Sequence, residues 1–307
     1  MVPAFVSPPL LVLRPLDQIL TNSKCNRIDR FSEILSEEFN RPLPSSLITS
    51  APFIPIVHNT YQCYRRSAEP NLRADLAKAH SKGYALGAKL VRGAYVESER
   101  AHWSAAGSIG DCVIWSNKVE TDHCFDSCAA FLEEKIALEI LEGKAGAPGT
   151  GVCFATHNGG STKAVLEKLR AHGLARNTED GRLEIDDRVR GRMTFAQLLG
   201  EFLFSCIPHL ERSLTRFDDV GMADNLTYSL VSLIAPPKAT AKGTETLPLV
   251  VKYVPFASVD QALPYLIRRA NENQSLLQAD PISGRGGARG ERQAIGREIR
   301  KRMGLSF

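Results

Sequence analysis

The sequence has no long hydrophobic run and little excess of charge of either sign. The longest apolar stretches, Leu10–Leu13 and Leu230–Ala235, fall far short of the roughly 18–20 residues that cross a bilayer. A net charge of +4, from 38 Lys+Arg against 34 Asp+Glu, is too small to indicate nucleic-acid binding. Membrane-spanning and nucleic-acid-binding proteins are therefore not expected.

Several common catalytic motifs are also missing. No G-x-G-x-x-G follows a predicted strand, and neither G-x-S-x-G nor a Walker motif occurs, so dinucleotide binding, serine hydrolysis and phosphoryl transfer lose their usual support. The seven cysteines are odd in number and scattered, which favours a reducing compartment over a disulfide framework. His123, Cys124 and Cys128 lie within one predicted helix whose apolar face includes Cys128, so we expect no zinc site.

From about residue 53 onward, short apolar strands alternate with amphipathic helices. This alternation predicts parallel strands with crossover helices, as in a (βα)8 barrel or a doubly wound sheet. Arg92, His157 and Tyr253 directly follow or end predicted strands, where a barrel keeps its active site, which favours the barrel. The predicted strands are 53–61, 84–91, 151–156, 192–198 and 247–253, and the predicted helices are 28–39, 69–81, 121–142, 161–171 and 259–274.

Five strands are fewer than the eight of a barrel, so we expect an incomplete barrel that lacks N-terminal strands. Residues 1–27 are left unassigned. Residues 1–14 contain one Arg and three prolines, and such a segment does not form the basic amphipathic helix of a mitochondrial presequence. The stretch 201–220 interrupts the pattern as an atypical insertion within a barrel-like domain over 28–307. Residues 236–246 have the composition of a surface loop.

Two adjacent arginines, Arg268 and Arg269, lie in an otherwise apolar predicted helix. A guanidinium group fits a carboxylate through two parallel hydrogen bonds, so this pair would clamp a small carboxylate substrate. The alternative is an exposed pair bonded to Glu272, three or four residues further on.

Two strand ends carry further candidates. In Lys89–Tyr95, Gly93 would let a ligand approach the backbone, Arg92 would meet a phosphate or a flavin ring edge, and Tyr95 would cover a small substrate; the alternative is a solvated strand end. His157 stands between Thr156 and Asn158 at another strand end, and its alternative is a structural histidine.

Together these residues resemble the proline dehydrogenase family, particularly the fungal mitochondrial enzymes. The resemblance covers about 28–307. The matching stretches are NTYQCYRR (59–66), GAKLVRGAYVESER (87–100), FATHN (154–158), FAQLLG (195–200), GMADNL (221–226) and KYVPF…LPYLIRRANENQSLL (252–277).

The resemblance implies a distorted (βα)8 barrel that holds FAD, oxidises L-proline to Δ1-pyrroline-5-carboxylate and passes electrons to ubiquinone. It further implies a peripheral position on the matrix side of the mitochondrial inner membrane. Arg268 and Arg269 would hold the proline carboxylate, with Glu272 fixing them, and Tyr253 and Tyr95 would enclose the ring. The residues expected along the FAD are Gln62, Lys89, Thr156, His157 and Gln197, with Arg92 as a further cofactor-binding candidate.

The sequence departs from the family in three places. The Lys and the Asp-Ala-Glu motif of the family's first strands are not found, and Ala257 replaces a usual glycine. Removing Glu201–Gly221 would rejoin QLLG to MAD, so our hypothesis is that this stretch is translated intron sequence. Two alternatives to an active proline dehydrogenase stay open: a catalytically inactive truncated remnant, and another barrel enzyme that binds an organic acid without flavin.

Overall fold

The structure is a computed structural model, and it describes residues 11–12, 22–41, 54–93, 95–108, 112–143, 148–198, 223–236 and 247–253. The chain divides into two compact units. The first unit comprises Met1–Ala196 and Val231–Val251, and the second comprises Gln197–Leu230 and Lys252–Phe307. No described helix is both long enough and apolar enough to cross a membrane.

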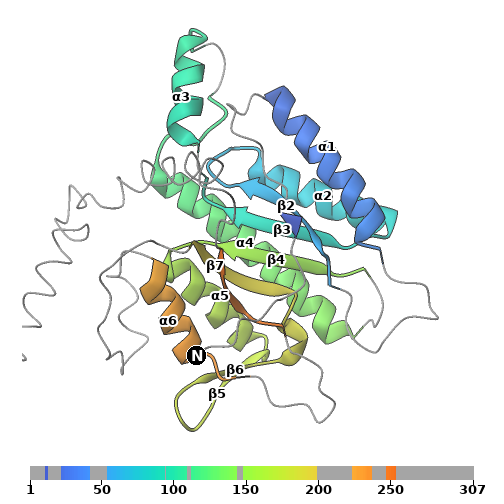
Figure 1. Ribbon diagram of the computed structural model, residues 1–307, viewed down its shortest axis with the longest axis vertical. Helices are drawn as coiled ribbons and strands as arrows, with labels where there is room; N and C mark the ends of the chain where they lie inside the picture. Colours follow the sequence, from blue (N-terminus) through green and yellow to red (C-terminus); the bar gives the residue numbers. More distant parts are fainter. Residues whose placement is uncertain are drawn as a thin grey trace, which may run out of the picture. The chain divides into compact units, whose positions relative to one another are not determined.

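A six-stranded sheet in the order β1-β2-β3-β4-β7-β8 forms the centre of the fold (Figure 1). The pairs β1–β2, β2–β3, β3–β4 and β4–β7 are all parallel, which confirms the predicted α/β architecture. The strands are β1 Leu11–Val12, β2 Val57–Gln62, β3 Leu86–Val91, β4 Thr150–Ala155, β7 Met193–Leu198 and β8 Val250–Tyr253, and a separate antiparallel hairpin contains β5 Ala175–Asn177 and β6 Leu183–Ile185.

The described helices follow the predicted ones closely where both exist. They are α1 Asn22–Phe39, α2 Ala68–Lys82, α3 Val96–Ala105, α4 Lys118–Glu142, α5 Gly159–Ala171 and α6 Ala223–Leu233. We predicted that α4 starts at Thr121 or Asp122, but it begins a turn earlier, because the side chain of Asn117 accepts a hydrogen bond from the Glu120 N–H at 2.9 Å.

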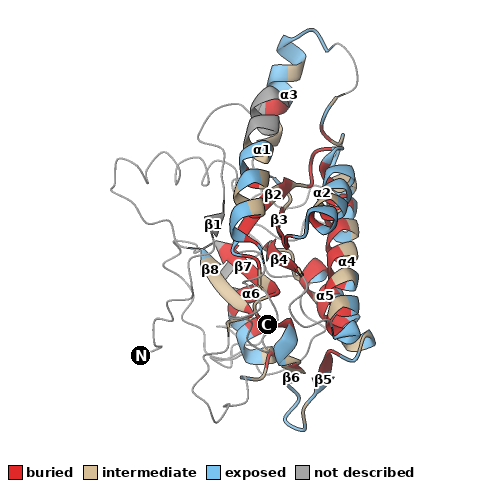
Figure 2. Ribbon diagram, turned by 90° about the vertical axis from the view of Figure 1, so that its right-hand side faces the viewer, coloured by how far each residue is buried: buried red, intermediate tan, exposed pale blue. Residues whose placement is uncertain are grey.

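Helices α2, α4 and α5 lie along one face of the first unit's strands (Figure 2). The Tyr61 hydroxyl on β2 donates to Asp75 of α2 at 2.9 Å, so Tyr61 lies on the face of the sheet that α2 covers. Its register partner Leu90 lies on the same face. Phe154 and Phe195 stack at 5.4 Å between ring centroids, and both are buried. Since side chains alternate along a strand, Lys89 points to the opposite face of the sheet.

Five of the described helices and strands were not predicted, and each has a weak local signal. Strand β1 has only two residues, and β5 and β6 have three each, too few for a visible alternation. Helix α3 (VESERAHWSA) is mostly polar or small, and α6 follows a stretch that we read as an insertion. The predicted helix 259–274 and the insertion 201–220 lie outside the described residues.

Candidate active site

Three of the predicted cofactor residues meet at the carboxyl ends of β2, β3 and β4. Gln62 ends β2 opposite Val91, and Val91 in turn lies opposite Ala155 of β4. Arg92 and Thr156 are the next residues of β3 and β4, so the parallel register brings all three to one edge of the sheet. This edge is where parallel α/β folds hold their ligands.

Arg92 is the centre of a polar network at this edge. Its Nη1 donates to Thr156 Oγ1 at 2.8 Å and its Nη2 donates to Ser161 Oγ at 2.9 Å. Its Nε donates to Asp122 of α4, and its guanidinium carbon lies 4.4 Å from the ring centre of Phe125. The planar guanidinium group of Arg92 therefore connects the ends of β3 and β4 to α4 and α5, and its fixed geometry orients the Thr156 side chain.

The charge balance around Arg92 is set by Asp122. Burial by itself would raise the pKa of Asp122, but hydrogen bonds from Arg92 and Lys118 outweigh it and hold the pKa below its usual value. Ser161, which receives the third Arg92 bond, donates to Asp126. The sequence analysis did not predict Asp122, Asp126 and Ser161 as site residues. They lie on amphipathic helices, where polar residues are expected to face the solvent.

Lys89 is a buried cation on the face of the sheet that is turned away from α2 and α4. It is 6% exposed, and its neighbours in register are Thr60 on β2 and Cys153 on β4. Burial, with a further contribution from the Lys89 charge, lowers the pKa of His58 to about 4, so this histidine is neutral at physiological pH. The site therefore contains a positive charge in a poorly hydrated setting, which suits an anionic or electron-rich ligand.

Gln62 supplies a test of whether the site fits the predicted cofactor. Its side-chain Oε1 is buried and has no hydrogen-bond partner within the described part of the chain. Gln62 shares a strand face with Thr60, the register partner of Lys89, so the unsatisfied acceptor and the buried cation face the same side. A buried acceptor without a donor is costly, and a ring N–H of a flavin is a donor of the required kind. The residues present thus fit FAD.

Gly93 has a packing role besides the predicted one. We predicted that Gly93 lets a ligand approach the backbone; on the side where a Cβ would stand, that Cβ would lie 1.7 Å from Cδ1 of Tyr64. The Tyr64 ring fills that space, and its hydroxyl donates to Glu99 at 2.6 Å. Gly93 also has a φ of 131°, which L side chains rarely adopt, so glycine is needed here for packing. Tyr95 is half-buried and precedes α3.

The remaining site predictions lie elsewhere in the chain. His157 is half-buried and follows Thr156 directly. Gln197 and Tyr253 belong to the second unit. There Gln197 is buried and its Oε1 accepts from Thr227 Oγ1 at 2.9 Å, while Tyr253 is 37% exposed. Arg268, Arg269 and Glu272 lie outside the described residues.

A cleft of about 310 Å³ is present near the opposite ends of the strands. It is lined by residues of the hairpin and of the turn before β7, including Arg176, Glu184 and Arg190. None of the predicted site residues borders it. The candidate site is thus defined by its polar residues at the carboxyl edge rather than by this cleft.

Comparison with known proteins shows the family of this chain. The model of the family described as proline dehydrogenase matches residues 27–200 and 219–279. "Proline dehydrogenase 2, mitochondrial" of Arabidopsis thaliana is 30% identical over 250 residues, 81% of this chain and 39% of the relative. "Proline dehydrogenase 1, mitochondrial" of Homo sapiens is 31% identical over 81% of this chain and 31% of its own length. The chain therefore spans about two-fifths or less of these two relatives.

Two further similarities are informative. "Hydroxyproline dehydrogenase" of Xenopus laevis is 29% identical over 95% of this chain and 50% of its own length. The crystal structure of proline utilization A from Bdellovibrio bacteriovorus, inactivated by N-propargylglycine, covers 85% of this chain and 19% of that protein, with a TM-score of 0.50 and 18% identity. At that identity the structural likeness establishes the fold alone. On the family match and the two identities of 30% and 31%, the chain belongs to the proline dehydrogenase family.

Proposed function

We propose that this chain carries the flavin- and substrate-binding part of an FAD-dependent enzyme that oxidises L-proline to Δ1-pyrroline-5-carboxylate. The observation that carries the proposal is the carboxyl-edge site, where a buried unsatisfied acceptor on Gln62 accompanies the buried charge of Lys89. The proposed FAD contacts are Gln62, Lys89, Thr156, His157 and Gln197. Arg92 joins them chiefly as a positioning residue, because three of its donors are engaged by protein groups.

The chemistry divides between cofactor and protein. When bound, FAD supplies the two-electron acceptor for the hydride that leaves the carbon next to the proline nitrogen. In our proposal Arg268 and Arg269 hold the substrate carboxylate, and Glu272 keeps their guanidinium groups in place. Tyr253 and Tyr95 enclose the pyrrolidine ring and exclude water. The protein needs no strong base beyond removal of the amine proton, so positioning is its main contribution.

We further propose that the electrons pass to ubiquinone and that the protein works on the matrix side of the mitochondrial inner membrane, in peripheral contact with it. The relatives from Arabidopsis thaliana and Homo sapiens are both named as mitochondrial, which supports the organelle. The acceptor and the membrane contact rest on the family resemblance.

The decisive test is the visible absorption spectrum of the purified chain, before and after anaerobic addition of L-proline. We expect a flavin spectrum that bleaches with proline, and an R268M variant that keeps the flavin absorbance but loses the bleaching. Arg176→Met is the matched control, because Arg176 is an exposed arginine paired with Glu184 on the β5–β6 hairpin. A colourless protein, or a flavin that proline does not bleach, would contradict the proposal and favour the inactive remnant.

A further inference from the structure

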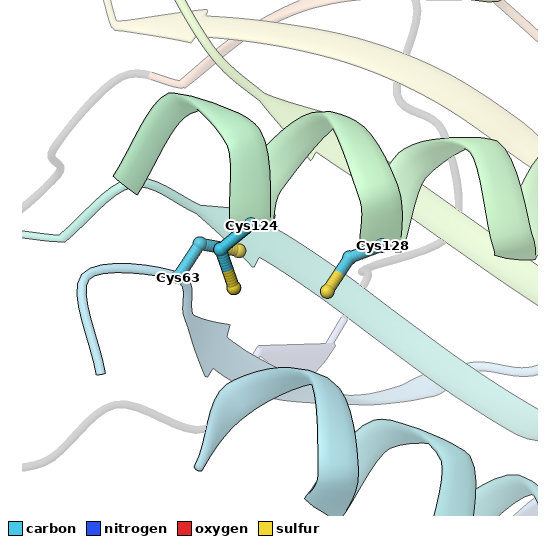
Figure 3. Close-up of side chains that lie close together, drawn as sticks. All are labelled: Cys63, Cys124 and Cys128. Carbon is cyan, nitrogen blue, oxygen red and sulfur yellow. The ribbon is translucent and has the colours of Figure 1, made fainter. Parts of the chain in front are cut away.

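Three cysteines that the proposed reaction does not use come together in the first unit. Cys63 directly follows β2, and Cys124 and Cys128 are four residues apart on α4, so they share one face of that helix. Figure 3 shows the two α4 side chains pointing to the side on which Cys63 lies. The three sulfur atoms all lie within 4.8 Å of one another. All three residues are buried, with 0%, 3% and 0% exposed area.

This spacing is close to that of sulfurs around a metal ion. With a metal–sulfur bond of about 2.3 Å, three thiolates around one ion are about 3.8–4.0 Å apart. The present separations need a contraction of about 1 Å or less, which side-chain rotation at Cys63, Cys124 and Cys128 can supply. Sequence analysis had grouped Cys124 and Cys128 with His123, but His123 is exposed, and the third member of the cluster is Cys63, which follows β2.

The surroundings of the cluster favour a thiolate. The thiols of Cys128 and Cys63, followed by the Trp115 indole and the backbone of Glu69, lower the pKa of Cys124. Glu69 lies in the first turn of α2, and the N-terminal end of a helix stabilises negative charge. The Trp115 nitrogen is buried beside Cys124. Its N–H is therefore available to a thiolate.

The other two thiols have raised pKa values. The pKa of Cys63 is raised well above its ordinary value by hydrogen bonding with Cys124 and Cys128 and by burial. The pKa of Cys128 is raised first by its hydrogen bond with Cys124. An ion that binds all three sulfurs must displace the protons that the thiols hold.

We propose that Cys63, Cys124 and Cys128 form a three-thiolate site for a soft d10 cation, Zn²⁺ or Cu⁺. Thiolates select such ions over hard cations such as Mg²⁺ or Ca²⁺. Among the described residues no fourth His, Cys, Asp or Glu joins the group, so Cu⁺ would be held by three sulfurs and Zn²⁺ would add a water.

The position of the site indicates a structural role. It ties the end of β2 to α4. Gln62 immediately precedes Cys63, and Asp122, which holds Arg92, lies two residues before Cys124. A bound ion would therefore fix the two elements that carry the carboxyl-edge site. The inference does not depend on the proposed reaction.

The test is a titration of the full chain, reduced and kept under anaerobic conditions, with Cd²⁺ as a soft d10 probe. We expect a sulfur-to-metal charge-transfer band in the ultraviolet that saturates at one ion per chain. Each of C63A, C124A and C128A should weaken binding at least tenfold. Cys153→Ala is the matched control, because Cys153 is also buried, lies on β4 and is outside the group. Competition with Zn²⁺ and Cu⁺ then identifies the preferred ion.

A measurement on the unaltered chain keeps the test valid if a variant fails to fold. Binding in weak buffer should release protons, because a thiol loses its proton when its sulfur binds the ion as a thiolate. No band at stoichiometric Cd²⁺, or a band that C153A abolishes and C124A does not, would overturn the proposal. Release of no proton would overturn it as well. In each case the three cysteines are core residues only.

Discussion

At the scale of single residues, Arg92 shows how one side chain can set the geometry of a strand edge. Its three hydrogen bonds reach α4, the end of β4 and α5, and its guanidinium group lies over the Phe125 ring. The sequence indicated a cation at this position, with a ligand as its partner. The partners within the chain are protein groups, so we propose that the side chain acts on bound flavin through Thr156.

We predict that Arg92→Met destabilises the protein by about 2 kcal/mol, since it removes hydrogen bonds to a carboxylate and two hydroxyls in a half-buried site. Bound flavin should fall with it, because Thr156 loses its orientation. Urea unfolding and the flavin-to-protein absorbance ratio measure the two effects. Arg176→Met serves again as the exposed control. A variant with unchanged stability and flavin content would contradict this role for Arg92.

At the scale of elements, Asn40 connects α1 to the two strands beside it. It is fully buried just after the helix ends. Its Nδ2 donates to the carbonyls of Val57 and Ala85 at 2.8 and 3.0 Å. Its Oδ1 accepts from the N–H groups of Ile56 and Val57 at 3.0 and 2.9 Å. All four side-chain hydrogen bonds are to backbone groups around the starts of β2 and β3. The Asn40 amide therefore satisfies backbone donors and acceptors at that end of the sheet.

We predict that Asn40→Ala lowers the free energy of unfolding by about 3 kcal/mol, because it leaves buried backbone groups without partners. Asn40→Asp should also be destabilising, since it buries a charge and loses both donors. Chemical denaturation measures both. The exposed Asn71 in α2 provides a control substitution with a small effect. A loss below about 1 kcal/mol would mean that water replaces the amide.

Helices α1 and α2 are also joined by charge. Glu33 of α1 lies 2.9 Å from Lys82 Nζ and 3.4 Å from Lys78 Nζ, both on α2. These lysines lower the pKa of Glu33 from 4.5 to about 2, first through the Lys82 hydrogen bond. A carboxyl whose folded pKa is depressed stabilises the protein above its unfolded pKa, and this stabilisation is lost as the pH falls through the folded value.

We therefore predict that Glu33→Gln is less stable than the unaltered chain by about 1 kcal/mol at pH 7, a value kept small by solvent screening of the half-exposed lysines. The difference should shrink between pH 4.5 and about 2 and vanish below. Thermal unfolding across this pH range measures it. Glu167, an exposed carboxyl near Lys163 on α5, is the control. A difference that is constant with pH would show that the effect is not electrostatic.

At the scale of the whole molecule, the two matched ranges of the family model leave out residues 201–218. This gap falls inside the stretch that the sequence pattern marks as atypical. We keep the hypothesis that Glu201–Gly221 is translated intron sequence. In that case the flanking segments QLLG and MADNL are continuous in the active protein.

We predict that deleting Glu201–Gly221 leaves the thermal midpoint unchanged or higher and raises the flavin bound per chain. Differential scanning calorimetry and visible absorption measure the two quantities on both chains. Transcript sequencing provides an independent check, since a continuous message that encodes 201–220 would refute the intron hypothesis. A deleted chain that loses its cooperative unfolding would refute it equally.

The sequence by itself determined the parallel α/β class and most of the elements, because apolar periodicity is a local property that buried strands and amphipathic helices both require. Polar residues at strand ends pointed to Arg92 and His157 as candidates, and the resemblance to the family added Gln62, Lys89 and Thr156. Only the tertiary structure decided which groups these residues meet. The partners of Arg92, the Tyr64 ring beside Gly93 and the meeting of Cys63 with Cys124 join residues 29 to 69 positions apart. Such contacts depend on strand register and helix packing, which no local pattern contains.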